Sequence, residues 1–273
     1  MSNFDTNSKA TVDVALAEAA NRLEVVLVGE RKYGWSHKSA GSLIERDDGV
    51  AWLRVASRSK PDENRIWNGV VDSGSISGVA KPRVLSWIDW RAGSIEWRAV
   101  VLEAIRGSTC SQTPELREAI ELPPHWLAEL STSLENLRST RTERVTCRQD
   151  LITRRIRERF GSDVDSRVTA WETCHGDLHW ANVTCPQFCI LDWEGWGIGP
   201  AGLDIAFLVA FSGLIPSIQD ELLSTLGQNL RSNNGRISLL FVVSELLRMI
   251  DLYGDHPDLE ASLTNLGRRA LNY

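Results

Sequence analysis

The first third of the chain alternates between short β-branched runs and polar turns, a pattern typical of strands. The turn Asp47-Asp-Gly49 separates two of these runs and indicates a hairpin. Five runs have strand character: 24–29, 41–45, 50–55, 84–87 and 97–103. The pattern therefore predicts a small sheet of five antiparallel strands.

Two helices are predicted in the same region. Apolar residues recur at helical spacing from Val12 to Leu23. A second helix opens at Pro61-Asp-Glu-Asn64, because proline and acidic side chains favour the first turn of a helix. Five strands and one helix make up the expected small lobe, and the N-terminal helix precedes them.

The pattern changes after Ile105, where a polar stretch with Gly and Pro indicates a connection. Beyond it, helical spacing of apolar residues dominates: 127–137, 151–160, 205–211, 221–230 and 238–252. Two shorter segments read as strands: 168–174 and 188–191. The sequence thus predicts an α+β chain with a sheet-containing lobe at 1–107, a hinge near 103–107 and a larger, mainly helical lobe at 108–273.

The loop between the last two predicted strands carries the most specific chemistry. It reads His175-Gly-Asp-Leu-His-Trp-Ala-Asn182, and an aspartate, Asp192, follows ten residues later. Phosphoryl transfer from ATP needs a carboxylate to accept the hydroxyl proton of the acceptor, and oxygen ligands to hold Mg²⁺. Asp177 suits the first role, and Asn182 with Asp192 suits the second. The flanking strands are expected to bring the three side chains together.

From Cys174 to Leu208 the chain resembles the aminoglycoside phosphotransferase-like small-molecule kinases, which include choline kinase-like proteins and share the protein-kinase fold. The segments CHGDLHWANVT and LDWEGWGIGPAGLDIAFL carry this resemblance, which is looser elsewhere. It implies a two-lobed kinase fold, with Asp177 as catalytic base and Asn182 and Asp192 as Mg²⁺ ligands. Asp204 matches an aspartate that braces the catalytic loop. Capping of its own helix is the alternative for Asp204.

The nucleotide-binding residues are expected in the small lobe. Its third strand offers Arg54 where kinases more often place a lysine, and the family tolerates this change. Glu63 is the expected carboxylate partner of Arg54, with Asp62 as the alternative. An outward-facing, purely structural Arg54 is the competing interpretation.

Two further segments are candidates for nucleotide contact. Ser36 and Ser39 lie in a turn with glycines at each end, which can cover phosphates with backbone N–H groups. This turn is no G-x-G-x-x-G match, so its signal is weak. In the hinge, Glu103 and Ile105 would hold adenine through backbone groups and apolar contact, as the resemblance implies.

Residues near the catalytic loop are candidates for binding the acceptor: His179, Trp180, Glu194 and Trp196. Tryptophan rings can form an apolar or cation-stacking wall, although core packing explains most tryptophans. His175 is grouped with Asp177 as catalytic, and orientation of the loop by hydrogen bonding is its favoured role. An acidic run at 251–260 is a second candidate wall, for which a solvated surface is the favoured interpretation.

The amino-acid composition limits the kinds of molecule that the protein is expected to bind. The 273 residues carry a formal net charge of −6, which argues against nucleic-acid binding and favours, weakly, a cationic acceptor. Five cysteines and a polar N-terminal start without a secretory pattern indicate a reduced cytoplasm. No apolar run approaches the roughly 18 residues that a membrane-spanning helix needs.

The leading interpretation is a Mg²⁺-dependent phosphotransferase that uses ATP, or GTP, to phosphorylate a hydroxyl of an aminoglycoside or other basic antibiotic, with antibiotic resistance as its role. A metabolite kinase acting on choline, thiamine, an amino-acid alcohol or a sugar is the alternative. A non-catalytic pseudokinase is disfavoured, because Asp177, Asn182 and Asp192 are all present. The sequence leaves open which acceptor, which hydroxyl and which oligomeric state apply.

Overall fold

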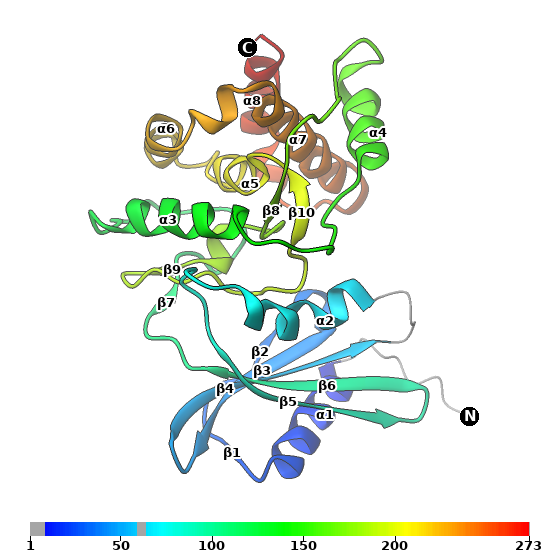
Figure 1. Ribbon diagram of the computed structural model, residues 1–273, viewed down its shortest axis with the longest axis vertical. Coiled ribbons are helices and arrows are strands. Elements are labelled where there is room, and N and C mark those ends of the chain that lie inside the picture. The colour runs from blue at the N-terminus through cyan, green and yellow to red at the C-terminus, as the bar shows by residue number, and fades with distance from the viewer. Residues whose placement is uncertain (1–8, 59–63, 273) are drawn as a thin grey trace. The chain divides into compact units, whose positions relative to one another are not determined.

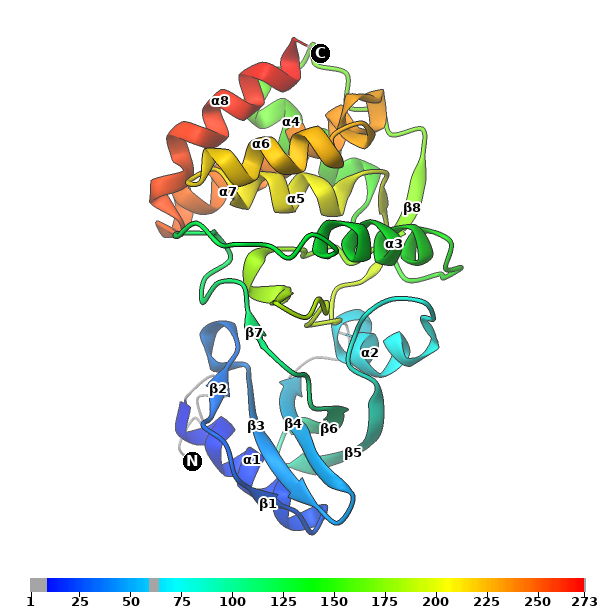
Figure 2. The same ribbon diagram turned by 90° about the vertical axis from the view of Figure 1, so that its left-hand side faces the viewer.

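The chain divides into two units in the computed structural model, which describes residues 9–58 and 64–272. The first unit comprises Met1–Ser75 and Lys81–Arg106, and the second comprises Ile76–Ala80 and Gly107–Tyr273. Figures 1 and 2 show a sheet-rich first unit and a mainly helical second unit. This is the predicted α+β, two-lobed kinase-like architecture.

The first unit is built on an antiparallel sheet of six strands within the described residues, in the order β1-β3-β4-β6-β5, with β2 also pairing with β3. The strands are β1 (Val26–Leu27), β2 (Lys32–Tyr33), β3 (Ser39–Arg46), β4 (Gly49–Arg58), β5 (Val84–Ala92) and β6 (Ile95–Glu103). Five strands were predicted. The first predicted strand shrinks to the two residues of β1, and β2 adds a sixth strand on the same edge.

Side-chain alternation explains how the sheet is covered. Leu53 and Val55 of β4 point to one face, where they pack with Val12 and Leu16 of helix α1 (Lys9–Arg22). Arg98 points to the other face and donates to the carbonyl of Trp67 on α2 (Asn64–Asp72) at 3.0 Å. The two helices therefore lie on opposite faces of the sheet (Figure 1).

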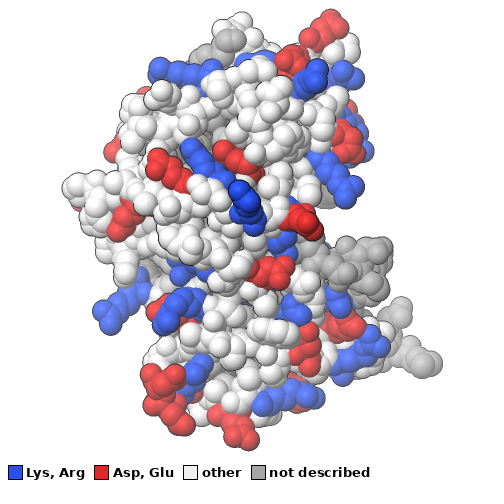
Figure 3. Space-filling view, in the orientation of Figure 1, with Lys and Arg blue, Asp and Glu red and all other residues white. Residues whose placement is uncertain are grey.

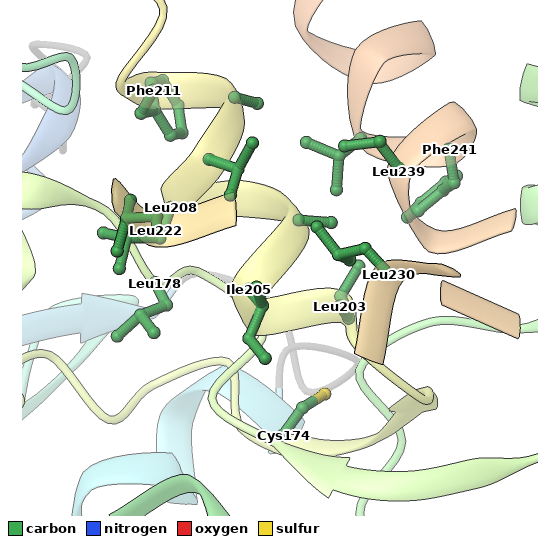
Figure 4. Packing of buried hydrophobic residues seen from close by; sticks show 14 of the residues in the cluster. Cys174, Leu178, Leu203, Ile205, Leu208, Phe211, Leu222, Leu230, Leu239 and Phe241 are labelled. Carbon is green, nitrogen blue, oxygen red and sulfur yellow. The ribbon is translucent and has the colours of Figure 1, made fainter. Parts of the chain in front are cut away.

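Six α-helices in the described chain form most of the second unit: α3 (Trp126–Arg138), α4 (Gln149–Phe160), α5 (Leu203–Phe211), α6 (Pro216–Thr225), α7 (Asn233–Tyr253) and α8 (Glu260–Leu271). Short antiparallel pairs join β7 (Ser108–Thr109) with β9 (Thr184–Cys185), and β8 (Trp171–Cys174) with β10 (Gly197–Pro200). Helix α5 is apolar all round, as expected of a helix at the centre of a core. Figure 4 shows Ile205 and Leu208 of α5 in the same cluster as Leu239 of α7.

Three expectations for this unit need correction. The helix predicted at 221–230 instead begins at Pro216, whose fixed φ suits a first turn, and ends at Thr225. The strand predicted at 188–191 is reduced to a single bridge between Val183 and Ile190. Helix α8 was not predicted, although its buried residues have helical spacing: Leu263, Leu266, Gly267 and Ala270.

Residues 76–80 depart from the predicted division at 107, because their contacts lie in the helical unit. Ile76 is buried in its core. The amide of Ala80 donates to the Ser133 hydroxyl at 3.3 Å, and its carbonyl accepts from the amide of Ile190 at 2.8 Å. Residues 76–80 therefore belong to the helical unit because of contacts with segments distant in the sequence, which no local sequence pattern reveals.

The surface carries both signs of charge. Positive and negative side chains are interspersed on the face seen in Figure 3. No helix within residues 9–58 and 64–272 combines the length and apolar character that crossing a bilayer requires.

Candidate active site

The loop predicted to be catalytic, residues 175–182, runs from β8 to a 3-10 turn at Trp180–Asn182. The amide of Leu191 donates to the carbonyl of Asn182 at 2.8 Å, next to the bridge between Val183 and Ile190. This backbone contact places Asp192, the next residue, beside Asn182. The predicted proximity of the two residues thus arises from one bridge and one hydrogen bond, where two regular strands had been expected.

Asp177 is the solvent-facing carboxylate of the loop, with a side chain 56% exposed. Its Oδ2 lies 3.6 Å from Nε2 of His179, and its backbone carbonyl accepts from the Asn182 amide group at 3.0 Å. Desolvation acts to raise the pKa of Asp177, but the nearby imidazoles of His179 and His175 outweigh it and lower the pKa. Asp177 is therefore an exposed carboxylate that is ionised at neutral pH.

Asp204 ties the loop to helix α5. Its Oδ2 accepts from the amide of His175 and its Oδ1 from the amide of Gly176, both at 2.8 Å. The carboxylate is buried, and burial raises its pKa although the two amides favour the charged form. No side chain caps α5. The hydrogen bonds of Asp204 therefore brace the loop, and the alternative of capping its own helix does not describe them.

His175 begins the loop, and its side chain is turned into the protein interior. The side chain is fully buried, and its Nε2 lies 2.8 Å from the carbonyl oxygen of Leu191. Because a carbonyl only accepts, Nε2 carries the proton in this contact. The ring also packs edge-on against Trp193, with centroids 4.9 Å apart. His175 thus links the loop to the residue before Asp192, and its grouping with the catalytic base is replaced by an orienting role.

Asn182 and Asp192 fit a Mg²⁺ ion by the chemistry of their donor atoms. The amide nitrogen of Asn182 faces the Asp177 carbonyl and, at 3.1 Å, Nε2 of His179, so its oxygen points away from these two groups. Asp192 adds an exposed carboxylate. The described residues hold no group of three His, Cys, Asp or Glu side chains arranged for a metal. One amide and one carboxylate suffice where phosphates and water complete the shell of Mg²⁺.

Asp192 has a left-handed backbone, with φ 58°. Aspartate tolerates this region better than most residues, at a cost of about 1–3 kcal/mol.

The loop that follows Asp192 is held by hydrogen bonds from a segment that the sequence did not single out. Arg144 donates to the carbonyls of Glu194 and Trp196, each at 3.1 Å, and the Thr146 hydroxyl donates to that of Gly195 at 2.8 Å. No motif marks this clamp, because its targets are backbone carbonyls about 50 residues away.

The predicted aromatic wall for an acceptor is not present at these tryptophans. Trp180 is 0% exposed and donates from Nε1 to the Ser212 hydroxyl at 2.9 Å, while its ring stacks on Trp126. Trp196 is 2% exposed, beneath the guanidinium of Arg144. Both rings belong to the core. His179, by contrast, keeps 12% of its side chain exposed and contacts Asp177.

Some of the candidate nucleotide-binding residues in the first unit contact each other, and others do not. Arg54 on β4 donates to the Ser39 hydroxyl at 3.2 Å, which joins two of the predicted residues. Ser39 is buried at the start of β3, so it belongs to the sheet, between β2 and β4, and not to a covering turn. Ser36 is exposed, with φ 51°. Glu63 lies outside the described residues.

The predicted hinge lies at the end of β6. Glu103 closes the strand and pairs with Arg83 at 3.1 Å, a hydrogen bond that outweighs desolvation and lowers the pKa of Glu103. Its side chain is therefore engaged on the surface of the first unit. Ile105 is half-buried just beyond the strand.

Neither a family model nor a curated protein matches the sequence of the chain. Solved structures do match its fold. A thermostable mutant of the aminoglycoside phosphotransferase APH(4)-Ia, in a ternary complex with ADP and hygromycin B, has a TM-score of 0.62 at 12% identity, over 94% of this chain and 97% of that one.

Two other solved structures extend the comparison. A microcompartment-associated aminopropanol kinase has a TM-score of 0.56 at 16% identity, over 95% of each chain. An aminoglycoside-3'-phosphotransferase of type VIII has a TM-score of 0.55 at 16% identity, over 85% of this chain and 98% of that one. The chain therefore has the two-lobed, kinase-like fold that aminoglycoside phosphotransferases share with an aminopropanol kinase.

Proposed function

We propose that this protein is a small-molecule kinase that transfers the γ-phosphoryl group of ATP to a hydroxyl of its acceptor. The observation that carries the proposal is the hydrogen bond from Leu191 to Asn182, which brings Asp192 beside Asn182 at the end of the loop that presents Asp177. A base and two hard oxygen donors are the parts that phosphoryl transfer requires. GTP is the alternative donor.

Each residue has a defined task in this proposal. Asp177, exposed and ionised, accepts the proton of the attacking hydroxyl and orients it toward the phosphorus. Asn182, through its oxygen, and Asp192 would hold Mg²⁺. When bound, Mg²⁺ neutralises charge on the phosphates. Asp204 and His175 keep the loop in place through backbone contacts.

The first unit would supply the nucleotide contacts. Arg54, steadied by Ser39, is the proposed cation for the phosphates, with Glu63 as its carboxylate partner. Ser36 is proposed to lie over the phosphates. Backbone groups from Glu103 to Ile105 are proposed to hold the base.

The acceptor class we favour is a hydroxyl compound that also carries an amine. Two of the fold neighbours are consistent with this, one with hygromycin B bound and one named an aminopropanol kinase. An aminoglycoside or other basic antibiotic is the leading candidate, which would make resistance the role. An amino alcohol, choline, thiamine or a sugar is the second candidate.

The test is transfer of radiolabelled γ-phosphate from ATP with Mg²⁺ to a panel of hygromycin B, kanamycin, 1-amino-2-propanol, ethanolamine, choline, thiamine and glucose. A phosphorylated product that depends on Asp177 supports the proposal, and its identity decides between antibiotic and metabolite. Binding of ATP without transfer to any acceptor and without hydrolysis would instead favour a pseudokinase. Asp177→Asn serves as the matched inactive chain.

A further inference from the structure

A buried carboxylate lies beside the catalytic loop and has no task in the chemistry above. Glu115 is 2% exposed. Its segment is held on one side by the amide of Trp180, which donates to the Pro114 carbonyl at 3.1 Å. On the other side the amide of Leu116 donates to the carbonyl of Phe211, at the end of α5, at 3.0 Å. Burial of a carboxylate costs free energy unless partners compensate it, so such a group calls for an explanation.

Arg117 and His256 face the Glu115 carboxylate. The guanidinium of Arg117 pairs with Oε1 and also reaches Asp258 at 2.8 Å. Nδ1 of His256 lies 2.7 Å from Oε2. Oε2 nevertheless has no aligned hydrogen bond among the described residues. The contact between Glu115 and His256 is therefore mainly electrostatic, and one buried oxygen keeps unused accepting capacity.

His256 is held in an unfavourable backbone conformation, with φ 54°. Such strain persists only where surrounding contacts impose it, and it often marks a functional site. The His256 ring packs edge-on against Phe211, and so does the ring of His179, with centroid distances of 5.5 and 5.6 Å. The two imidazoles therefore lie within about 11 Å of each other, and both contact Phe211. His179 is the neighbour of the proposed base, Asp177.

We propose that His256, oriented by Glu115, is an acceptor-binding residue of the proposed kinase, on which this inference rests. A carboxylate beside Nδ1 favours the tautomer with its proton on Nδ1, which leaves a lone pair on Nε2. The side chain is 23% exposed, and no hydrogen bond to Nε2 is found within the described chain. Nε2 accordingly accepts a hydrogen bond from a hydroxyl or ammonium group of the acceptor.

The position of His256 also defines the kind of acceptor. The hydroxyl to be phosphorylated lies at Asp177, beside His179, and the second group of the acceptor is bound by His256. The acceptor is therefore a polyol or amino alcohol whose second donor group is separated from the reacting hydroxyl by a distance comparable to the spacing of the two imidazoles, at most about 11 Å.

The experiment compares steady-state kinetics of His256→Phe, His256→Gln and Glu115→Gln, using the acceptor of the panel above that the wild-type protein phosphorylates. His125→Gln is the matched control, because His125 is an exposed histidine of the same unit. We expect His256→Phe to raise KM for the acceptor about tenfold, with kcat and KM for ATP within about twofold of wild type. His256→Gln, whose amide oxygen can accept a hydrogen bond, recovers part of the loss.

Each outcome decides the inference. An unchanged KM for the acceptor in His256→Phe overturns it while the proposed kinase stands. A fall in kcat together with a rise in KM for both the acceptor and ATP, equal in His256→Phe and His256→Gln, also overturns it. A merely structural role of His256 has that signature. If Glu115→Gln, a substitution at a buried position, fails to fold, the two His256 variants alone decide the inference. Absence of any phosphorylated acceptor, together with absent ATP hydrolysis, overturns the proposed function and this inference with it.

Discussion

The two oxygens of Asp204 accept hydrogen bonds from the two consecutive amides of His175 and Gly176, each at 2.8 Å, so that a buried carboxylate of helix α5 holds the start of the loop that presents Asp177. Asp204→Ala would leave both amides without partners. Each unsatisfied buried donor costs about 1–3 kcal/mol. We expect the free energy of unfolding to fall by about 2–4 kcal/mol, and turnover to fall with it, measured by urea titration and phosphoryl transfer.

Asp150 offers a matched control for that prediction. It is the second residue of α4, as Asp204 is of α5, but it is exposed. Asp150→Ala should change stability by less than about 1 kcal/mol, the range of a helix-dipole effect. Equal losses in the two variants would mean that Asp204 acts on its own helix and not on the loop.

Asp177→Asn should abolish most turnover and leave the fold intact. Loss of a positioned base costs about 10²- to 10⁴-fold in rate. The Asn182 side chain bonds the backbone carbonyl of Asp177, which the substitution keeps. Melting temperature and nucleotide affinity should therefore stay near wild type. Near-normal turnover with any acceptor would remove Asp177 from the role of base.

Mg²⁺-dependent nucleotide binding should weaken more in Asp192→Asn than in Asn182→Ala, because the first removes a full charge. Asparagine is the substitution of choice at residue 192 because it tolerates the φ of 58°. The variant therefore tests the loss of charge without adding backbone strain. Isothermal calorimetry of ADP with and without Mg²⁺ measures the effect. If both variants bound Mg·ADP as the wild type does, the ion would have to be held elsewhere.

Arg144→Leu should loosen the loop after Asp192, because the carbonyls of Glu194 and Trp196 lose their donor. Hydrogen–deuterium exchange of residues 193–197 should rise, and the apparent affinity for Mg²⁺ should fall. Arg141→Leu is the control, since Arg141 is an exposed arginine three residues away. Unaltered exchange in Arg144→Leu would show that Thr146 and the core hold the loop without it.

Cysteine reactivity follows from burial. Burial, with Cys185 nearby, raises the pKa of Cys110 to about 12, and burial raises that of Cys174 well above its ordinary value. At pH 8 the thiolate fraction of Cys110 is about 10⁻⁴, so iodoacetamide should spare it in the folded protein. Peptide mass spectrometry should show labelling of the half-buried Cys185 and Cys189 before the buried Cys147 and Cys174. Rapid native labelling of Cys110 would contradict this environment, whereas all five should react in urea.

Much of the fold was predictable because its determinants are local. The periodicity at 151–160 and 238–252 indicated α4 and α7, whose apolar stripes must face a core. Predictions failed where length or register is set by distant partners. The first strand is short because its regular pairing with β3 is limited to Val26 and Leu27, followed by one hydrogen bond from Val28 to Leu43. The chain crosses to the helical unit at Ile76–Ala80 because its partners, Ser133 and Ile190, lie there.

The sequence by itself determined the candidates for base and metal ligands, since the order of Asp177, Asn182 and Asp192 along the chain carries their chemistry. Only the tertiary structure decided what surrounds them. Burial depends on segments far apart: Trp180 was a candidate for the acceptor, yet it stacks on Trp126 and bonds Ser212 inside the core. In the same way Glu115 and His256 are 141 residues apart in number and 2.7 Å apart in space, a pairing that folding alone creates.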